Sequence, residues 1–106
     1  MPKVIISAEV EDLVQWEKGF RSHGDLFRRQ TVTKPISIST NEKNEVALIF
    51  EASDLGTFMQ ILESEGPAAM ANDGVKKETV KIFVMDKEFK LWIKQTGVYK
   101  HLRSLF

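Results

Sequence analysis

The hydrophobic pattern predicts a strand and then a helix at the start of the chain. Residues 3–10 form a short segment rich in β-branched side chains, which is typical of a strand. Asp12 provides a helix N-cap, and the apolar residues after it recur at spacings of three and four up to about Phe27. The side chains that share this helical face are Leu13, Trp16, Phe20, His23 and Phe27. We therefore expect one helix over residues 13–27.

The middle of the chain predicts a β-hairpin. Pro35 ends the helical pattern, because a residue that precedes proline disfavours the helical conformation. Residues 36–39 read Ile-Ser-Ile-Ser, which is the alternation of a half-buried strand. Residues 41–44 are polar, and residues 45–51 resume an apolar run, so the two segments should pair across a turn.

A second helix and a fourth strand follow the hairpin. Asp54 is a candidate N-cap, and the stripe after it consists of Leu55, Phe58, Met59 and Leu62. Gly66 and Pro67 are expected to interrupt this helix before a further turn or two over residues 68–72. Residues 79–86 read as a strand. The element order is βαββαβ, which predicts an α+β domain with both helices on one face of a four-stranded antiparallel sheet.

The strands carry apolar side chains on both of their faces. Val46, Leu48 and Phe50 alternate with Ala47 and Ile49, and the first and fourth strands show the same two-sided pattern. Two helices cover only one face of such a sheet. Because large exposed apolar patches are uncommon on monomers, we expect a second copy to cover the other face and the protein to be a homodimer.

The last part of the chain differs in composition from the rest. From Lys87 to Phe106 there are five Lys or Arg residues, one acid and many apolar side chains at roughly helical spacing. We therefore divide the chain into a domain over residues 1–87 and an amphipathic helical extension over residues 88–106, interrupted near Gly97. Burial of a large apolar side chain contributes roughly 1.5 to 3 kcal/mol, so the extension is expected to pack across the partner subunit. A basic helix lying on a membrane is the rival interpretation, although the segment is short for that purpose.

Composition narrows the classes of function. At 106 residues the chain suits one domain, and its 15 basic residues balance 15 acidic ones, which gives no field that attracts nucleic acid. The absence of cysteine excludes disulfides, thiolate nucleophiles and iron–sulfur clusters, and favours the cytoplasm. No stretch is long enough and apolar enough to suggest a membrane span. We expect neither nucleic acid nor membrane as a partner.

The first helix carries the most specific motif in the sequence. Trp16, Phe20 and His23, with Arg28 after them, look like the Trp-x3-Phe-x2-His pattern of small bacterial members of the dimeric α/β-barrel superfamily. Together with the element order over residues 3–86 and the two-sided strands, this motif resembles the antibiotic-biosynthesis-monooxygenase-like and cyclase-like members. The resemblance implies a ferredoxin-like fold and a dimeric α/β barrel formed by packing sheet against sheet. Such members include cofactor-free monooxygenases, cyclases, isomerases, haem-degrading enzymes, ligand-sensing domains and many proteins of unknown function, so fold alone does not settle activity.

The candidate site residues lie on and just after this helix. His23 is the candidate catalytic residue, because an imidazole can remove or return a proton near neutral pH. Trp16, Phe20 and Phe27 are candidate contacts for a planar substrate, and Arg28 could hold a carboxylate or enolate at the mouth of a cleft. The alternative interpretations are a packed histidine, an aromatic core and a solvated charge at a helix end.

Two departures from related patterns argue against haem as a cofactor and against RNA as a partner. Residues 55–64 contain neither His nor Trp and the first strand has no Asn, which argues against haem, and His101 has no second metal ligand at useful spacing. Residues 45–51 offer one aromatic side chain and two acids, unlike a strand that stacks RNA bases. We therefore expect no cofactor. The leading hypothesis is an enzyme or binding protein for a small apolar or aromatic molecule in a helix–sheet cleft, for example a cofactor-independent monooxygenase-like or cyclase-like enzyme. The alternative is a non-catalytic ligand-sensing or assembly domain.

Overall fold

Residues 1–91 fold in the order β-α-α-β-β-α-β. A computed structural model describes residues 1–91, and residues 92–106 lie outside the described part. The strands are β1 (Lys3–Glu9), β2 (Ser37–Thr40), β3 (Glu45–Glu51) and β4 (Lys81–Val84). The helices are α1 (Leu13–Arg21), α2 (Gly24–Arg29) and α3 (Leu55–Asn72), and a short 3-10 helix, η1, spans Lys77–Thr79.

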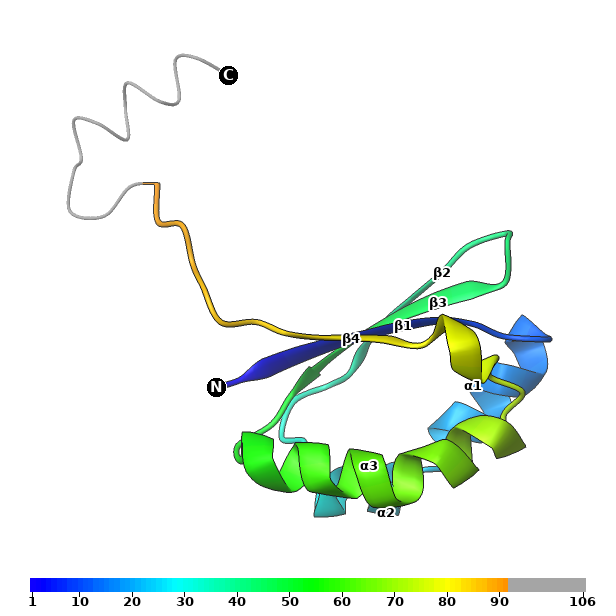
Figure 1. Cartoon of the computed structure of the whole chain (residues 1–106), viewed down its shortest axis with the longest axis horizontal. Coiled ribbons are helices and arrows are strands. Elements are labelled where there is room, and N and C mark those ends of the chain that lie inside the picture. Colours follow the sequence, from blue (N-terminus) through cyan, green and yellow to red (C-terminus); the bar gives the residue numbers. More distant parts are fainter. Residues whose placement is uncertain (92–106) are drawn as a thin grey trace.

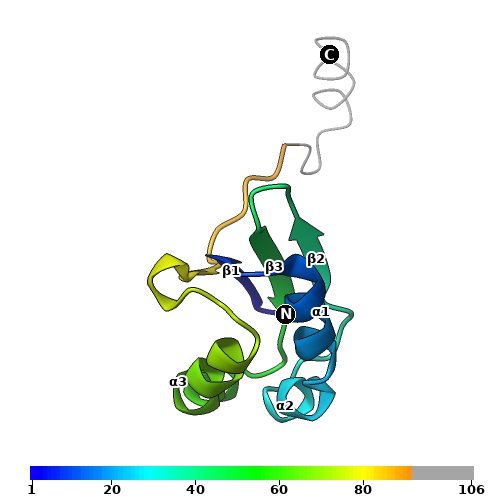
Figure 2. The same cartoon turned by 90° about the vertical axis from the view of Figure 1, so that its right-hand side faces the viewer.

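The strands form one antiparallel sheet in the order β2-β3-β1-β4. All three helices lie on one side of this sheet, and residues 85–91 lead away from the domain on the other side (Figures 1 and 2). This arrangement is a ferredoxin-like α+β fold, which confirms the predicted fold class for the described residues. None of the helices over residues 1–91 is long and apolar enough to cross a membrane.

Both predicted helix caps are present. The Asp12 carboxylate accepts a hydrogen bond from the Gln15 backbone N–H (3.0 Å), and the Asp54 carboxylate accepts one from the Thr57 backbone N–H (3.0 Å). These bonds satisfy amide groups that the first turn of a helix leaves without partners. The hydrogen bond from Thr57 also lowers the pKa of the Asp54 carboxyl, because it stabilises the charged form.

The expectation of one helix over residues 13–27 is wrong at its centre. Helix α1 ends at Arg21, and α2 begins at Gly24. The Ser22 hydroxyl donates to the Gly19 carbonyl (2.5 Å), and such local bonds compete with helix continuation. His23 leaves helical geometry at φ −93°, ψ 25°, and Gly24 adds a residue of low helix propensity. The break leaves His23 at the corner between the two helices.

The expected interruption at Gly66 and Pro67 is also wrong, because α3 continues through both residues to Asn72. Proline removes only one helical hydrogen bond, and tertiary packing can compensate for that loss. Gly66 is buried in this helix, and a Cβ atom there would lie 3.0 Å from Leu62 Cδ1. Close packing at Gly66 therefore favours the continuous helix.

Strand β4 is shorter than the predicted segment 79–86. Thr79 belongs to η1, where its hydroxyl accepts from the Glu9 N–H (2.8 Å) and donates to the Lys76 carbonyl (2.6 Å). These two bonds hold the chain in a turn before regular pairing with β1 begins at Lys81.

The two faces of the sheet are both apolar, as the alternation predicted. The helix-facing side chains of the central strands are buried and include Val4, Ile6, Ala8, Val46, Leu48 and Phe50. On the opposite face, the register places Ile49, Ile5 and Phe83 side by side across β3, β1 and β4. Ile49 is 41% exposed and Phe83 is 54% exposed. This outer row has no cover among residues 1–91.

Candidate functional site

A cavity of about 70 Å³ lies between the helices and the helix-facing side of the sheet. Its walls are formed by side chains of all three helices together with β1 and β3. Almost all of these side chains are apolar. Within the described residues, the polar side chains that reach the wall are those of His23, Gln30 and Asp73.

Aromatic rings form a continuous cluster along one side of the cavity. The Phe20 ring stacks on Trp16 with centroids 5.0 Å apart and lies 4.9 Å from the Phe27 ring. Phe27 in turn lies 5.7 Å from Phe50, which is 5.4 Å from Phe58. These separations are those of favourable aromatic pairs, so the cluster is a stable wall that offers ring faces and edges to a ligand.

His23 and Asp73 form the one pair of ionisable side chains on this wall. The His23 Nε2 atom lies 2.8 Å from Asp73 Oδ2. Only 5% of the Asp73 side chain and 20% of the His23 side chain are exposed. Asp73 is held at the end of α3, where its backbone N–H donates to the Ala69 and Met70 carbonyls (3.1 Å each). These bonds fix the backbone from which the carboxylate reaches the imidazole.

Gly19 provides the space for this carboxylate. A Cβ atom at Gly19 would overlap Asp73 Oδ1, and it would also crowd the carboxylate carbon at 2.7 Å. Any larger residue in this turn of α1 would push Asp73 away from its position. The pair consequently depends on three elements: α1 leaves the space, the corner after α1 holds His23, and the end of α3 holds Asp73.

The pairing decides which imidazole nitrogen is available for chemistry. An ionised carboxylate has no proton to donate, so the contact with Asp73 requires a proton on His23 Nε2. In the neutral imidazole, Nδ1 is then the nitrogen with a free lone pair. Within residues 1–91, the His23 side chain makes no other hydrogen bond. The arrangement suits His23 to accept a proton at Nδ1.

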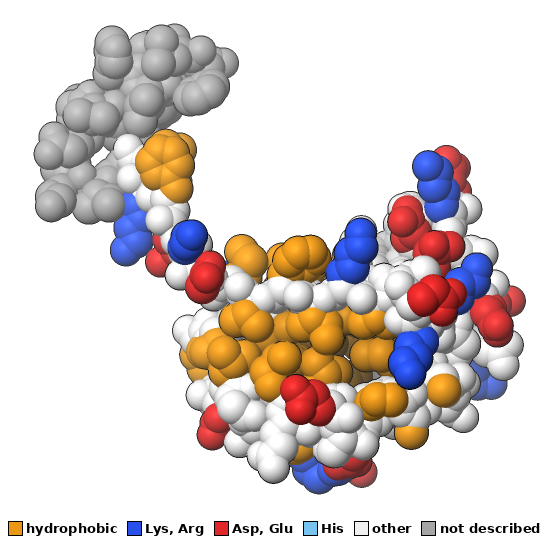
Figure 3. All heavy atoms as spheres, viewed as in Figure 1, with side chains coloured by type: hydrophobic (Ala, Val, Ile, Leu, Met, Phe, Trp, Pro, Cys, Tyr) orange, Lys and Arg blue, Asp and Glu red, His pale blue; other side chains and the backbone are white. Residues whose placement is uncertain are grey.

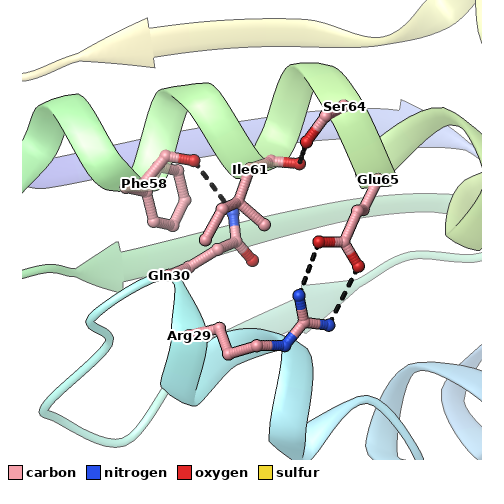
Figure 4. A network of polar contacts seen from close by, with 6 residues as sticks. All are labelled: Arg29, Gln30, Phe58, Ile61, Ser64 and Glu65. Carbon is pink, nitrogen blue, oxygen red and sulfur yellow. Dashed lines mark hydrogen bonds and ion pairs between the residues drawn. The ribbon is translucent and has the colours of Figure 1, made fainter.

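Gln30 contributes an amide group on the other side of the cavity. It is buried, and its Nε2 donates to the Phe58 backbone carbonyl (3.2 Å), as Figure 4 shows. Among the described residues, no group donates to its Oε1 atom. This oxygen is a hydrogen-bond acceptor for a hydroxyl or amine of a ligand.

An ion pair joins α2 to α3 beside Gln30. The Arg29 guanidinium contacts both carboxylate oxygens of Glu65, with Nη2 2.9 Å from Oε1 (Figure 4). This hydrogen bonding lowers the pKa of Glu65 and raises that of Arg29, because each charge stabilises the other. Arg29 and Glu65 precede two cavity-lining residues, Gln30 and Gly66, so the pair holds α2 against α3 next to the cavity.

Four of the five residues expected at the site line the cavity: Trp16, Phe20, His23 and Phe27. Arg28 does not. Its side chain is 74% exposed, and its Nη2 atom lies 2.6 Å from Asp25 Oδ1. Both residues lie on α2, where a spacing of three residues brings their side chains together on the exposed surface of the helix. The polar residues Ser37 and Ser39 pair with Ile49 and Ala47 on the outer face of the sheet, so they do not line the cavity.

Sequence reasoning missed Asp73, Gln30 and Gly19. Asp73 is 50 residues from its partner and stands in the sequence as an ordinary polar residue at a helix end. No local sequence pattern marks a carboxylate that tertiary packing will bury. Over residues 1–91, no three His, Asp or Glu side chains gather as a metal site would require.

Comparisons with known proteins support the fold. No family model matches the chain, and no curated protein is similar to it in sequence. The solved structures that it resembles include SnoaB, a cofactor-independent oxygenase from Streptomyces nogalater, with a TM-score of 0.62 and 18% identity over 85% of this chain and 95% of that one. An antibiotic biosynthesis monooxygenase gives a TM-score of 0.59 and 15% identity over 84% of this chain and 100% of that one. Rv0793 from Mycobacterium tuberculosis gives a TM-score of 0.56 and 10% identity over 85% of this chain and 98% of that one. These likenesses confirm the ferredoxin-like fold of antibiotic-biosynthesis-monooxygenase-like proteins that the sequence resembles.

Proposed function

We propose that the protein binds a small apolar or aromatic molecule in the helix–sheet cavity and that His23 removes a proton from it. The observation that carries this proposal is the His23–Asp73 pair, in which a buried carboxylate contacts Nε2 of an imidazole on a largely apolar wall. A base in such surroundings meets little competing water, so its proton transfer to and from a bound molecule is direct. The aromatic cluster favours a planar substrate. The Gln30 Oε1 atom favours a substrate with a hydroxyl group that can donate a hydrogen bond to it.

The reaction class that best fits this arrangement is cofactor-independent oxygenation or cyclisation. Removal of a proton from a phenol or an activated C–H group leaves an electron-rich anion. Such an anion can react with molecular oxygen directly or close a ring internally. SnoaB, which shares the fold, is a cofactor-independent oxygenase. In this proposal His23 is the base, Asp73 orients it, and Trp16, Phe20 and Phe27 hold the ring system.

The size of the cavity sets a condition on the proposal. Pockets that hold drug-sized ligands measure about 300 to 1,000 Å³, whereas this one measures about 70 Å³. A substrate with an aromatic ring therefore requires α2 and α3 to separate. Helix α2 has six residues and none of them is buried, so it is the element that moves most easily.

We further propose that the functional unit is a homodimer in which two sheets pack outer face to outer face. The row of Ile49, Ile5 and Phe83 supports this, and Ser37 continues the same row on β2 as part of a polar border. Exposed apolar surface of this kind on a small protein favours association.

Oxygen uptake with electron-rich phenols tests the proposed activity. With 1-naphthol as the probe, we expect wild-type protein to consume oxygen and His23→Gln to lose about 100-fold or more of that rate, since positioned bases contribute about 10²- to 10⁴-fold. Binding of the probe, followed by the fluorescence of the protein, should change little in this variant. Equal rates in wild type and His23→Gln would contradict the role of His23.

The small cavity favours a second candidate, a non-catalytic ligand-sensing or assembly domain. In that case His23 and Asp73 would serve to pin α1 and α2 to the end of α3. The discriminating result is a protein that binds no phenol, consumes no oxygen, and loses stability when either side chain is replaced.

A further inference from the structure

An apolar groove lies beside the candidate site, between α3 and the edge strand β4, and it shares Leu62, Met70 and Val75 with the wall of the cavity. Its volume is about 400 Å³, and its floor and walls consist mainly of Met59, Leu62, Pro67, Met70, Val80 and Ile82. Figure 3 shows hydrophobic side chains gathered along a hollow between the sheet and α3. Glu63 and Lys77 are the charged residues that line it.

The groove is open because α3 does not extend over the edge of the sheet. Pairing with Ile6 and Val4 places Ile82 and Val84 on the helix-facing side of β4. Side chains in that position are normally buried, yet Ile82 is 41% exposed and Val84 is 38% exposed. The groove therefore carries a core-like surface without a cover among residues 1–91.

The chain itself contains a segment suited to cover it. Residues 92–106 include seven large apolar side chains, at Trp92, Ile93, Val98, Tyr99, Leu102, Leu105 and Phe106. The same segment has three cations, Lys94, Lys100 and Arg103, and no Asp or Glu. The charged residues of the groove are Glu63 on α3 and Lys77 on η1, whereas Glu65 of α3 is paired with Arg29. The apolar content of the segment therefore matches that of the groove, and Glu63 offers an ionic partner to one of the three cations.

The direction of the chain selects which copy receives the segment. Residues 85–91 leave the domain on the side of the sheet opposite the helices (Figures 1 and 2), and Phe89 is 87% exposed. The groove of the same copy lies on the helix side. In a dimer packed outer face to outer face, the chain departs toward the second copy.

We propose that residues 92–106 of one copy dock in the α3–β4 groove of its partner. This inference rests on the proposed homodimer. The segment would cover Ile82 and the apolar side chains of α3 that line the groove, with one of its cations near Glu63, so each subunit covers the exposed edge of the other's hydrophobic core.

Photo-crosslinking in a mixed dimer tests the proposal with the full chain. The chain has no cysteine, so Ala71→Cys, at an exposed groove position, accepts a single maleimide-benzophenone label. Labelled ¹⁴N protein is refolded with an equal amount of unlabelled ¹⁵N wild type, irradiated and digested. We expect adducts with peptides from residues 92–106, and about half of them should be ¹⁵N peptides because half of the partners are heavy.

Two matched variants serve as controls. The same label at Val14→Cys, on α1 and 82% exposed, should give few adducts with residues 92–106. Ile82→Arg in the labelled Ala71→Cys chain places a cation in the groove against a basic segment and should reduce the adducts severalfold, whereas Val14→Arg should not.

Each other outcome has a distinct meaning. Adducts with ¹⁴N peptides alone mean that the segment docks in its own groove, which overturns the exchange between subunits. A dimer in sedimentation that gives no adducts with residues 92–106 overturns the docking and leaves the proposed homodimer intact. A monomer in sedimentation overturns both.

Discussion

Asp73 determines the chemical state of His23 although the two residues are far apart in the sequence. A histidine at the end of a helix normally faces water and exchanges between tautomers. Here Nε2–H donates a hydrogen bond to a buried, ionised carboxylate, so that Nδ1 is left as the basic nitrogen of the neutral ring. The same orienting logic appears wherever a carboxylate supports a catalytic imidazole.

Replacement of Asp73 by Asn should alter this tautomer with little change in shape. Asn can donate as well as accept, so it no longer requires a proton on His23 Nε2. We expect ¹⁵N spectra of the imidazole to show one tautomer in the wild type and a mixture in Asp73→Asn. Any oxygen uptake that depends on His23 should fall by about 10-fold or more. An unchanged spectrum would show that Asp73 does not orient the ring.

Gly19→Ala tests the space that the carboxylate occupies. Its Cβ would overlap Asp73 Oδ1, so either α1 or the end of α3 must move. Overpacking of this kind costs about 1 to 3 kcal/mol, which urea denaturation measures directly. Gly24→Ala is the matched control, because its Cβ would meet only Arg28 Nη2 at 3.8 Å. A neutral result for Gly19→Ala would mean that the site adapts and that the glycine is not required.

At the scale of elements, the sequence predicted what local patterns encode. The caps at Asp12 and Asp54 and the hairpin over residues 36–51 all have short-range signals, and the structure confirms them. The errors arose where tertiary contacts decide. Spacing placed Trp16 and Phe27 on one helix, yet the chain bends at Ser22 and still brings both rings to one cavity.

Two polar residues of the cavity, Gln30 and Asp73, could not be predicted for the same reason. Periodicity identifies the face of a helix but not the helix end that will meet it, so it indicated His23 but not Asp73. Arg28 was expected at the mouth of the cleft because it follows the aromatic run, but its side chain is exposed and pairs with Asp25 on the same helix. A continuous α3 through Pro67 likewise depends on packing around Gly66, which proline statistics do not include.

The Arg29–Glu65 pair gives a prediction about helix motion. Glu65→Gln removes the charge that holds α2 against α3, so 1-naphthol should bind faster, as measured by stopped-flow fluorescence. Glu63→Gln is the control, since Glu63 lies on the same helix and makes no ion pair among the described residues. Equal binding rates in both variants would show that α2 does not control access.

The contribution of the Arg29–Glu65 pair to stability should depend on pH, and the direction of that dependence follows from the lowered pKa of Glu65. Pairing with Arg29 lowers the pKa of Glu65 in the folded protein, so the pair stabilises the fold above the ordinary pKa of glutamate. That contribution is lost as the pH falls through the lowered value. The difference in stability between wild type and Glu65→Gln is therefore expected to shrink toward acid pH and, because both side chains are exposed, to be small throughout.

At the scale of the whole molecule, residues 1–91 present an apolar sheet face and an apolar groove, and the two surfaces differ in geometry. The outer face of the sheet is a flat row across three strands, which suits an identical row related by two-fold symmetry. The α3–β4 groove is concave and suits a narrow segment. The sequence predicted the first surface from two-sided strands, but the groove depends on how far α3 reaches across the sheet, which no local pattern records.

Phe83→Glu tests the flat face. The Phe83 side chain is 54% exposed and lies beside Ile5 in the outer row, so a carboxylate there would be buried against its symmetry mate in a dimer. Burial of unpaired like charges costs far more than a small interface gains. We expect sedimentation to show a dimer for the wild type at micromolar concentration and a monomer for Phe83→Glu.

Val14→Glu, at an exposed position on α1, should remain dimeric. Circular dichroism must show native secondary structure in each variant, because β4 pairs along β1 at this residue. If the folded Phe83→Glu variant were still a dimer, the subunits would associate through another surface, and the α3–β4 groove would be the first place to look for it.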